Sequence, residues 1–269
     1  MAGEITLSHD GAVSCVTVSH AGRFNAMTRP MWRALRTVFE ALQGRDGVRC
    51  VVVRGAAGHF CAGGDISEYP AFRFSEEALR DFHENDVWGG LSAMLACDVP
   101  LVAQIEGNCM GAGMEIASCC DMRIAGISAK FGAPIAKLGF PMAPREAALV
   151  AGAAGVLTAT EMLLTAAVLD APEMKSRGFL NQVVPDTDVG AAAYAMAQRV
   201  ANLAPEAAKY NKQTFRALIR PLASALAGKF ASESGADLVA RAYRYADSPE
   251  HREGIGAFLD KRPPAFQKP

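Results

Sequence analysis

The chain repeats one local pattern, in which a short apolar run ends in glycine and is followed by a helix-like segment. Residues 51–53 (Val-Val-Val) precede the turn 55–58, Leu101–Ile105 ends shortly before Gly107, and residues 122–125 form a third such run. Short continuous apolar runs are typical of strands covered on both faces, and glycine permits the sharp turns that follow them. The repeated pattern therefore predicts a layered α/β core.

A helix is predicted after the first strand-like segment, residues 13–18. Thr28 is a suitable N-cap, because its hydroxyl can accept a hydrogen bond from a free N–H of the first turn. Apolar residues then recur at helical spacing, namely Met31, Leu35, Val38, Phe39 and Leu42. This spacing places them on one helix face, which we expect to be buried.

The last third of the chain differs in composition from the rest. From about Thr187 onward, segments such as 190–197 and 205–218 are rich in helix-forming residues. No linker separates this part from the preceding one. We therefore predict one domain, with a core over residues 1–186 and a helical C-terminal part over residues 187–269 that docks on the core or on a neighbouring subunit.

Composition excludes several classes of function. The formal net charge of −1 provides no overall field for nucleic acid or an anionic membrane, and no apolar run is long enough to span a bilayer. The seven cysteines show no CxxC spacing, and their odd number argues against a disulfide framework, so we expect a reducing cytoplasm. The N-terminus has no basic segment followed by an apolar one, so no secretory signal is expected.

Two glycine-rich turns suggest the chemistry. The first, residues 59–66, reads HFCAGGDI, and the second, residues 107–115, reads GNCMGAGME and leads into a helix. Small residues at a helix N-terminus let a ligand approach free backbone N–H groups, and the helix dipole favours negative charge there. Two such turns that converge on one carbonyl oxygen would form an oxyanion hole.

The glycines of these turns are compatible with two further roles. Residues 111–113 could begin a dinucleotide-binding fingerprint, but the third glycine position is Ile116, so that match fails. The glycines could also serve close packing of a helix on a strand, and the residues alone leave this role open. The chain has no G-x-S-x-G, P-loop or zinc spacing, so no metal site is predicted.

Together the motifs resemble those of the crotonase (enoyl-CoA hydratase/isomerase) superfamily, over nearly the whole chain. The segments that carry the resemblance, in the family's order, are RFNAM at 23–27, FCAGGDI at 60–66, GNCMGAGMEIASCCDMRIA at 107–125, AKFGAP at 129–134, GFLNQVVP at 178–185 and EGIGAFLDKRPPAF at 253–266. The resemblance implies a spiral of ββα units, with a helical C-terminal part that builds homotrimers, often paired into homohexamers.

The resemblance also implies the substrate and the groups that bind it. Members bind acyl-CoA thioesters, whose oxygen would be held here by the N–H groups of Ala62 and Ala112. Arg23 and Lys261 lie near the family's basic CoA contacts. The segment that matches the lining of the CoA adenine pocket consists of Ala62, Gly63, Gly64, Asp65 and Ile66. No cofactor is expected, because coenzyme A is part of the substrate.

Glu115 matches the first of the two glutamates with which a hydratase of this family positions and deprotonates water. The second is missing, because its place directly after Pro134 is taken by Ile135, which cannot transfer a proton. Glu146 could supply a replacement carboxylate, or it could only favour a helix N-terminus. Asp121 is interpreted as a structural carboxylate at the start of a strand.

Residues 74–95 are predicted to form a helical lid over the acyl pocket. Within the lid His83 could act as acid or base, but a surface histidine without a role is the default interpretation. The leading hypothesis is an acyl-CoA enzyme that works through an oxyanion-stabilised enolate, nominally an enoyl-CoA hydratase and hence a lyase, with Glu115 as the acid/base. The alternatives are an acyl-CoA isomerase or decarboxylase, for which one carboxylate or none suffices, and a non-catalytic acyl-CoA-binding protein.

Overall fold

The computed structural model describes residues 2–43, 45–229 and 242–266, and within them it forms two sheets. The strands of the larger sheet, in spatial order, are β1 (Glu4–Asp10), β2 (Val13–Ser19), β3 (Cys50–Gly55), β4 (Leu101–Ile105), β6 (Met122–Gly126) and β9 (Gln182–Val184). Those of the smaller sheet are β5 (Asn108–Met110), β7 (Lys130–Gly132) and β8 (Val168–Asp170). Except for the antiparallel pairs β1–β2 and β7–β8, neighbouring strands are parallel, as the repeated strand-turn-helix pattern leads one to expect.

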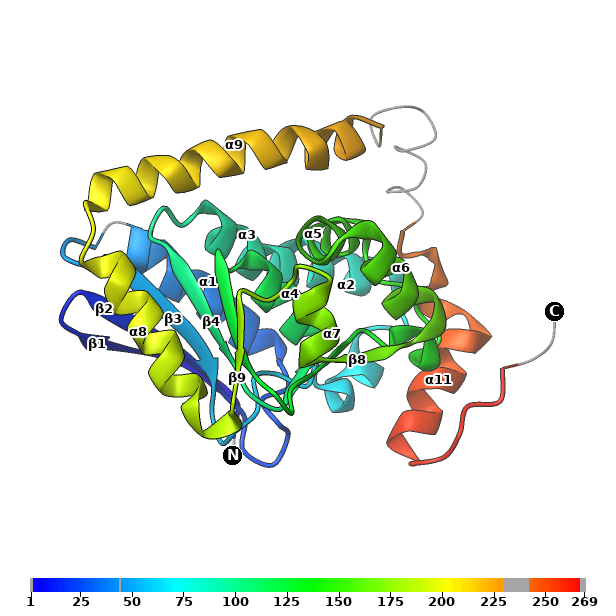
Figure 1. The fold of residues 1–269 in the computed structure, drawn as a ribbon. Helices are drawn as coiled ribbons and strands as arrows, with labels where there is room; N and C mark the ends of the chain where they lie inside the picture. The colour runs from blue at the N-terminus through cyan, green and yellow to red at the C-terminus, as the bar shows by residue number, and fades with distance from the viewer. Residues whose placement is uncertain (1, 44, 230–241, 267–269) are drawn as a thin grey trace.

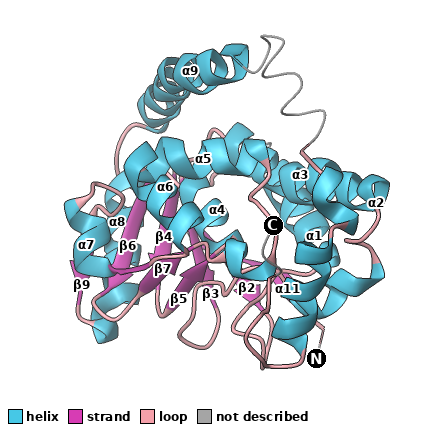
Figure 2. Ribbon diagram, turned by 90° about the vertical axis from the view of Figure 1, so that its right-hand side faces the viewer, coloured by secondary structure: helices cyan, strands magenta, loops and turns pink. Residues whose placement is uncertain are grey.

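Both faces of the larger sheet are covered by helices, which confirms the layered α/β prediction (Figures 1 and 2). Along β3, Val51 and Val53 belong to the main core, whereas Val52 packs with Ala193 and Ala197 of α8 (Val189–Ala201). Successive side chains of a strand point to opposite faces, so both faces of β3 need apolar residues. This accounts for the uninterrupted valines in the sequence.

Helix α1 (Arg29–Gln43) forms where its periodicity predicts. The Met31 N–H donates to Thr28 Oγ1 at 3.3 Å, which confirms Thr28 as the N-cap. Its fully buried apolar residues include four of the predicted set, Met31, Leu35, Phe39 and Leu42, together with Trp32. Val38 is partly buried against the same core.

The predicted lid is helical throughout its central part. It consists of α2 (Glu76–Asp81), a π-helical turn at Phe82–Val87 and α3 (Trp88–Ala96). Helix α3 packs against α1 and α4 (Ala112–Cys119), and the buried Leu79 and Phe82 of the first half belong to the same core, so both halves of this segment pack into the interior. π-Helical turns inside helices occur frequently at functional sites.

Three helices follow residue 187 in the described part of the chain. These are α8, α9 (Pro205–Lys229) and α11 (Pro249–Leu259). Helix α9 runs along one side of the molecule (Figure 1), and the Lys212 ammonium anchors it through Asp121 at 2.8 Å. The carboxylate of Asp121 also accepts from the Leu101 N–H at 2.7 Å, which confirms its structural role. Residues 230–241 of the predicted helical C-terminal part lie outside the described residues.

Candidate active site

The two glycine-rich turns lie side by side. A parallel bridge pairs Cys61 with Cys109. The Cys61 N–H donates to Asn108 O at 2.8 Å, and the Met110 N–H donates back to Cys61 O at 2.9 Å. Cys61 of the first turn is therefore paired with β5, the strand that leads into helix α4. Segments almost fifty residues apart are brought to one place, as the oxyanion-hole hypothesis requires.

Glycine is needed where the turns touch. Gly63 has φ +111° and Gly111 has φ +48°, both in the region that side chains disfavour. A β-carbon on Gly111 would lie 3.5 Å from Gly63 Cα, and one on Gly113 would lie 2.5 Å from Cys61 O. The small residues of both motifs therefore permit a close backbone approach at the N-terminus of α4.

The predicted oxyanion donor Ala62 is not free in this structure. Its N–H donates to Phe24 O at 3.0 Å, because the loop after β2 crosses the first turn there. Two residues on, the N–H of Gly64 has no acceptor among the described residues, and the N–H of Ala112 is the first of helix α4 and has none within the helix. Gly63 and Gly111, the residues directly before these two donors, touch each other, since a β-carbon on Gly111 would lie 3.5 Å from Gly63 Cα. The free donors next to this contact are therefore Gly64 and Ala112.

The predicted CoA-binding residues differ in their surroundings. Arg23 and Lys261 are exposed, as basic contacts for phosphates would be. Asp65 is buried and caps a short 3-10 helix, η1 (Ile66–Ala71), because its Oδ1 accepts from the Ser67 N–H at 3.1 Å and from its hydroxyl at 2.6 Å. The Asp65 carboxylate thus serves as the cap, and the backbone is bonded as well, because the Asp65 N–H donates to Met27 O at 2.8 Å and Asp65 O accepts from the Glu68 N–H at 3.1 Å. Ile66 is half-buried and packs against the core.

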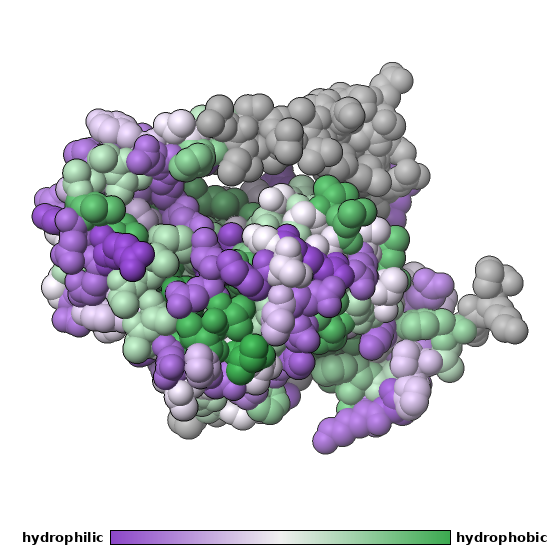
Figure 3. Space-filling model, viewed as in Figure 1, coloured by the Kyte–Doolittle hydropathy of each residue, from purple (hydrophilic) through white to green (hydrophobic). Residues whose placement is uncertain are grey.

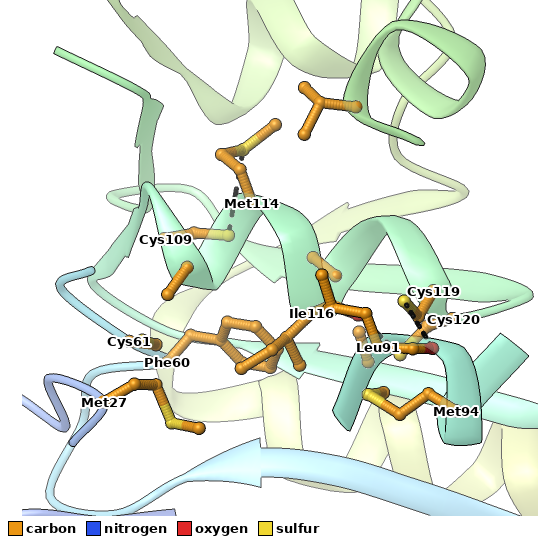
Figure 4. Close-up of a cluster of buried hydrophobic side chains, with 14 of the residues drawn as sticks. Met27, Phe60, Cys61, Leu91, Met94, Cys109, Met114, Ile116, Cys119 and Cys120 are labelled. Atoms are coloured by element: carbon orange, nitrogen blue, oxygen red, sulfur yellow. Dashed lines mark hydrogen bonds between the residues drawn. The ribbon is translucent and has the colours of Figure 1, made fainter. Parts of the chain in front are cut away.

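Glu115 is held inside the molecule by helix α4, all of whose residues are buried. Figure 4 shows the apolar neighbours, with Met114 directed toward Cys109 and Ile116 toward Leu91. Burial raises the pKa of the Glu115 carboxyl from 4.5 to about 8, and the nearby charge of Glu146 adds to this rise, which makes Glu115 a protonated acid at neutral pH.

Glu146 lies beside His83 in the protein interior. It stands in the first turn of α5 (Pro144–Ala154) and is 2% exposed, so it is more than a surface partner of the helix dipole. His83 Nδ1 lies 3.0 Å from Glu146 Oε1. His83 is largely buried, which corrects its interpretation as a surface residue, and its Nε2 is buried without a hydrogen-bond partner among the described residues. Burial lowers the pKa of His83, although the hydrogen bond with Glu146 opposes this shift.

The contact between His83 and Glu146 attaches the predicted lid segment to α5. Next to it, Arg145 forms an ion pair with Glu84 at 2.8 Å, and the Tyr243 hydroxyl donates to Glu84 at 2.8 Å. Ile135 begins a short 3-10 helix, η3 (Ile135–Leu138), and packs against the core as an apolar wall. Helices α4 and α5 pack together, so the carboxylate that faces Glu115 comes from α5.

Sequence reasoning missed a buried cation near these carboxylates. Arg73 is 1% exposed, and its guanidinium lies 4.3 Å from the ring centre of Tyr69 and 4.0 Å from that of Phe140. It donates to His251 Nε2 at 3.4 Å and to the Tyr245 hydroxyl at 3.1 Å. These partners are 178 and 172 residues away along the chain, so no local signal marks them.

Comparison with known proteins identifies the family. The family model described as enoyl-CoA hydratase/isomerase matches residues 8–269. The chain belongs to the enoyl-CoA hydratase/isomerase family. This membership confirms the resemblance drawn from the motifs, and with it an enzyme family that acts on acyl-CoA thioesters.

Relatives of this enoyl-CoA hydratase/isomerase family member match it along its whole length. A "Probable enoyl-CoA hydratase" of Mycobacterium bovis is 29% identical over 263 residues, which cover 97% of each chain. The crystal structure of an enoyl-CoA hydratase/carnithine racemase from Magnetospirillum magneticum has a TM-score of 0.78 and 35% identity, and it covers 98% of this chain and 95% of its own. A methylmalonyl-CoA decarboxylase, with a TM-score of 0.85 and 23% identity over 99% of each chain, shares the fold. The crotonase-type fold is thereby confirmed.

Within the described residues, no cluster of three or more His, Cys, Asp or Glu side chains is arranged to bind a metal ion. None of the described helices combines the length and apolar character that crossing a membrane requires. All seven cysteines are free.

Proposed function

We propose that the chain hydrates a 2-enoyl-CoA through a thioester enolate, which makes it a lyase. The observation that carries the proposal is the buried pair Glu115 and Glu146, supplied by two packed helices beside the free donors of Gly64 and Ala112. The proposed reaction needs no cofactor, since coenzyme A is part of the substrate. The free cysteines fit the reducing cytoplasm that we propose as its location.

The two N–H groups would bind the thioester oxygen. Attack at the β-carbon moves negative charge onto that oxygen, and donors that are already oriented stabilise this charge without reorganising. The Ala112 donor also stands at the start of helix α4, where the helix dipole favours an anion. This pair replaces the pair Ala62 and Ala112 that the motif alone suggested.

The two carboxyl groups would divide the proton transfers. Glu146, oriented by His83, accepts the proton of the water that attacks the β-carbon. Glu115, which is protonated at neutral pH, then gives its proton to the α-carbon of the enolate. Hydration needs one ionised carboxylate as base and one protonated carboxyl group as acid, and a pair of carboxyl groups with different proton affinities provides both. Glu146 thus takes the role for which Ile135 is unsuited.

Two alternatives to hydration remain as separate proposals. Isomerisation moves a proton from one carbon to another and could use Glu115 alone. A non-catalytic acyl-CoA-binding protein would keep the pocket without a use for the buried carboxyl pair, whose burial costs free energy. A crotonyl-CoA hydration assay beside a binding measurement with butyryl-CoA separates a hydratase from a binding protein, because only the hydratase turns crotonyl-CoA over. An isomerase would bind butyryl-CoA and would convert a 3-enoyl-CoA into a 2-enoyl-CoA, which the binding protein would not do.

The elevated pKa of Glu115 predicts a pH dependence. Hydration should fall as pH rises through about 8, because Glu115 then loses the proton it must donate. Stability should change at lower pH, between about 4.5 and 8, since the unfolded chain releases this proton near pH 4.5 and the folded chain only near 8. The free energy of unfolding of the wild type should therefore decline between these pH values relative to that of Glu115→Gln. Parallel pH curves for the two proteins, measured by urea unfolding, would contradict the assignment.

We propose that the chain forms trimers or dimers of trimers. Apolar residues reach the surface among the polar ones (Figure 3). The exposed large apolar side chains include Val156, Leu157 and Leu164 of α6 (Val156–Thr165), and Tyr210 and Phe215 of α9. Such a collection on a single chain indicates a partner surface. Light scattering at micromolar concentration should give three or six times 28.4 kDa. A clean monomer would rule the proposal out, and Leu157→Glu should lower the measured mass.

A further inference from the structure

Arg73 is a buried cation without an anion. No carboxylate of the described residues forms an ion pair with it, although only 1% of the residue is exposed. Removing a charge from water costs several kcal/mol unless a counter-charge and hydrogen bonds compensate. Surface arginines of this chain such as Arg36 and Arg252 do have carboxylate partners. Arg73 lies in the interior, where a partner is needed most.

The residues around Arg73 hold its guanidinium in place, but they supply no negative charge and leave one of its nitrogens without a hydrogen bond. Tyr69 and Phe140 contact its guanidinium through their rings, which supplies a cation–π attraction. His251 accepts the Nε–H, and its own Nδ1 lies 2.9 Å from Ala246 O, so His251 is the neutral tautomer protonated on Nδ1. The remaining terminal nitrogen, Nη1, has no hydrogen bond among the described residues.

A second unused donor lies between Arg73 and the oxyanion hole. The hydroxyl of Tyr69 has no hydrogen-bond partner among the described residues, and Tyr69 is 7% exposed. This hydroxyl approaches Gly64 so closely that a β-carbon there would collide with it. The charge of Arg73 also acts on the carboxyl of Glu115. Arg73 and Tyr69 thus border the place where the acyl group of a bound thioester would lie.

We infer that the acyl group of the substrate carries a second carboxylate, which Arg73 binds with the help of the Tyr69 hydroxyl. The inference rests on the proposed function, because it takes the acyl-CoA site as given. A guanidinium with a free edge matches the two oxygens of a carboxylate, and such charge-assisted bonds are the strong ones. The substrate class is therefore the CoA monothioesters of dicarboxylic acids.

A purely structural role for Arg73 makes a different prediction. The cation could balance the negative charge that Glu115 and Glu146 share. In that case its removal would change the proton affinity of the carboxyl pair and would alter the binding of every acyl-CoA alike. Recognition of a carboxylate instead changes the ratio between two ligands that differ only in that group.

The test compares glutaryl-CoA with pentanoyl-CoA, which have the same chain length and differ in the terminal carboxylate. Calorimetric titration of the wild type should give a Kd for glutaryl-CoA about tenfold lower or more. Arg73→Met should reduce this ratio to about one, and Arg73→Lys should retain part of it, because a charge without the fork binds a carboxylate less well. The matched control is Arg36→Met, which removes an exposed arginine of helix α1 and should keep the ratio.

The outcomes separate the inference from the function on which it rests. Equal affinity of the wild type for both ligands would overturn the inference while leaving acyl-CoA binding intact. Failure to bind either ligand would instead overturn the proposed function and the inference with it. If Arg73→Met does not fold, Tyr69→Phe keeps the ring under the guanidinium and removes only the hydroxyl. That variant should lower the ratio severalfold, and an unchanged ratio would remove Tyr69 from the site.

Discussion

Glu115→Gln is expected to lower kcat for crotonyl-CoA hydration by about 10²–10⁴, the usual contribution of a positioned acid or base. Glutamine has nearly the same shape, so the buried position in helix α4 should be kept, but an amide cannot give up the proton that the enolate requires. Binding of butyryl-CoA, measured by calorimetry, should persist within a few-fold. Loss of turnover with retained binding would identify Glu115 as a proton-transfer group.

Glu146→Gln and Glu40→Gln complete this experiment. If Glu146 is the base that activates water, Glu146→Gln should lower kcat about as much as Glu115→Gln. The contact with His83 Nδ1 orients the Glu146 carboxylate for this role. Glu40→Gln, which affects an exposed ion pair on α1, should leave turnover unchanged. If both interior variants hydrate crotonyl-CoA as fast as the wild type, the assigned acid/base chemistry is wrong.

The parts of the fold that follow from local patterns could be predicted from the sequence. The valines of β3 fit burial on both faces, and the spacing of Met31, Leu35 and Phe39 gives α1 its buried face. The two glycine-rich turns could be recognised for the same reason, since glycine at Gly63 and Gly111 is required by the local backbone. In each case the residues that determine the local structure lie within a few positions of it in the sequence.

The rest of the site depends on contacts that no local pattern encodes. Which N–H groups are free is decided by the loop that brings Phe24 O to Ala62, and this contact spans 38 residues. The attachment of His83 to Glu146 spans 63 residues. The sequence itself shows that the acid expected after Pro134 is replaced by Ile135. That Glu146, on a different helix, faces Glu115 can be seen only in the three-dimensional structure.

Ala112→Pro is expected to lower kcat by about 10²–10³, the usual cost of losing one oxyanion donor. Ala112 is the first residue of helix α4, and proline is well tolerated there because it fits the helical φ and removes an N–H that has no helical acceptor. The substitution therefore deletes the donor with little change to the helix. Activity with crotonyl-CoA and thermal unfolding of the same sample measure the two effects separately.

Gly64→Ala, with Ala62→Gly as its control, tests which residue supplies the second donor. Ala62→Gly retains the N–H that donates to Phe24 O, so its turnover should stay close to that of the wild type. Gly64→Ala forces a β-carbon against the Tyr69 hydroxyl, which should displace the backbone donor and reduce kcat strongly. Full activity of a folded Ala112→Pro protein would refute the oxyanion hole. Normal activity of a folded Gly64→Ala protein would instead return the second donor to Ala62.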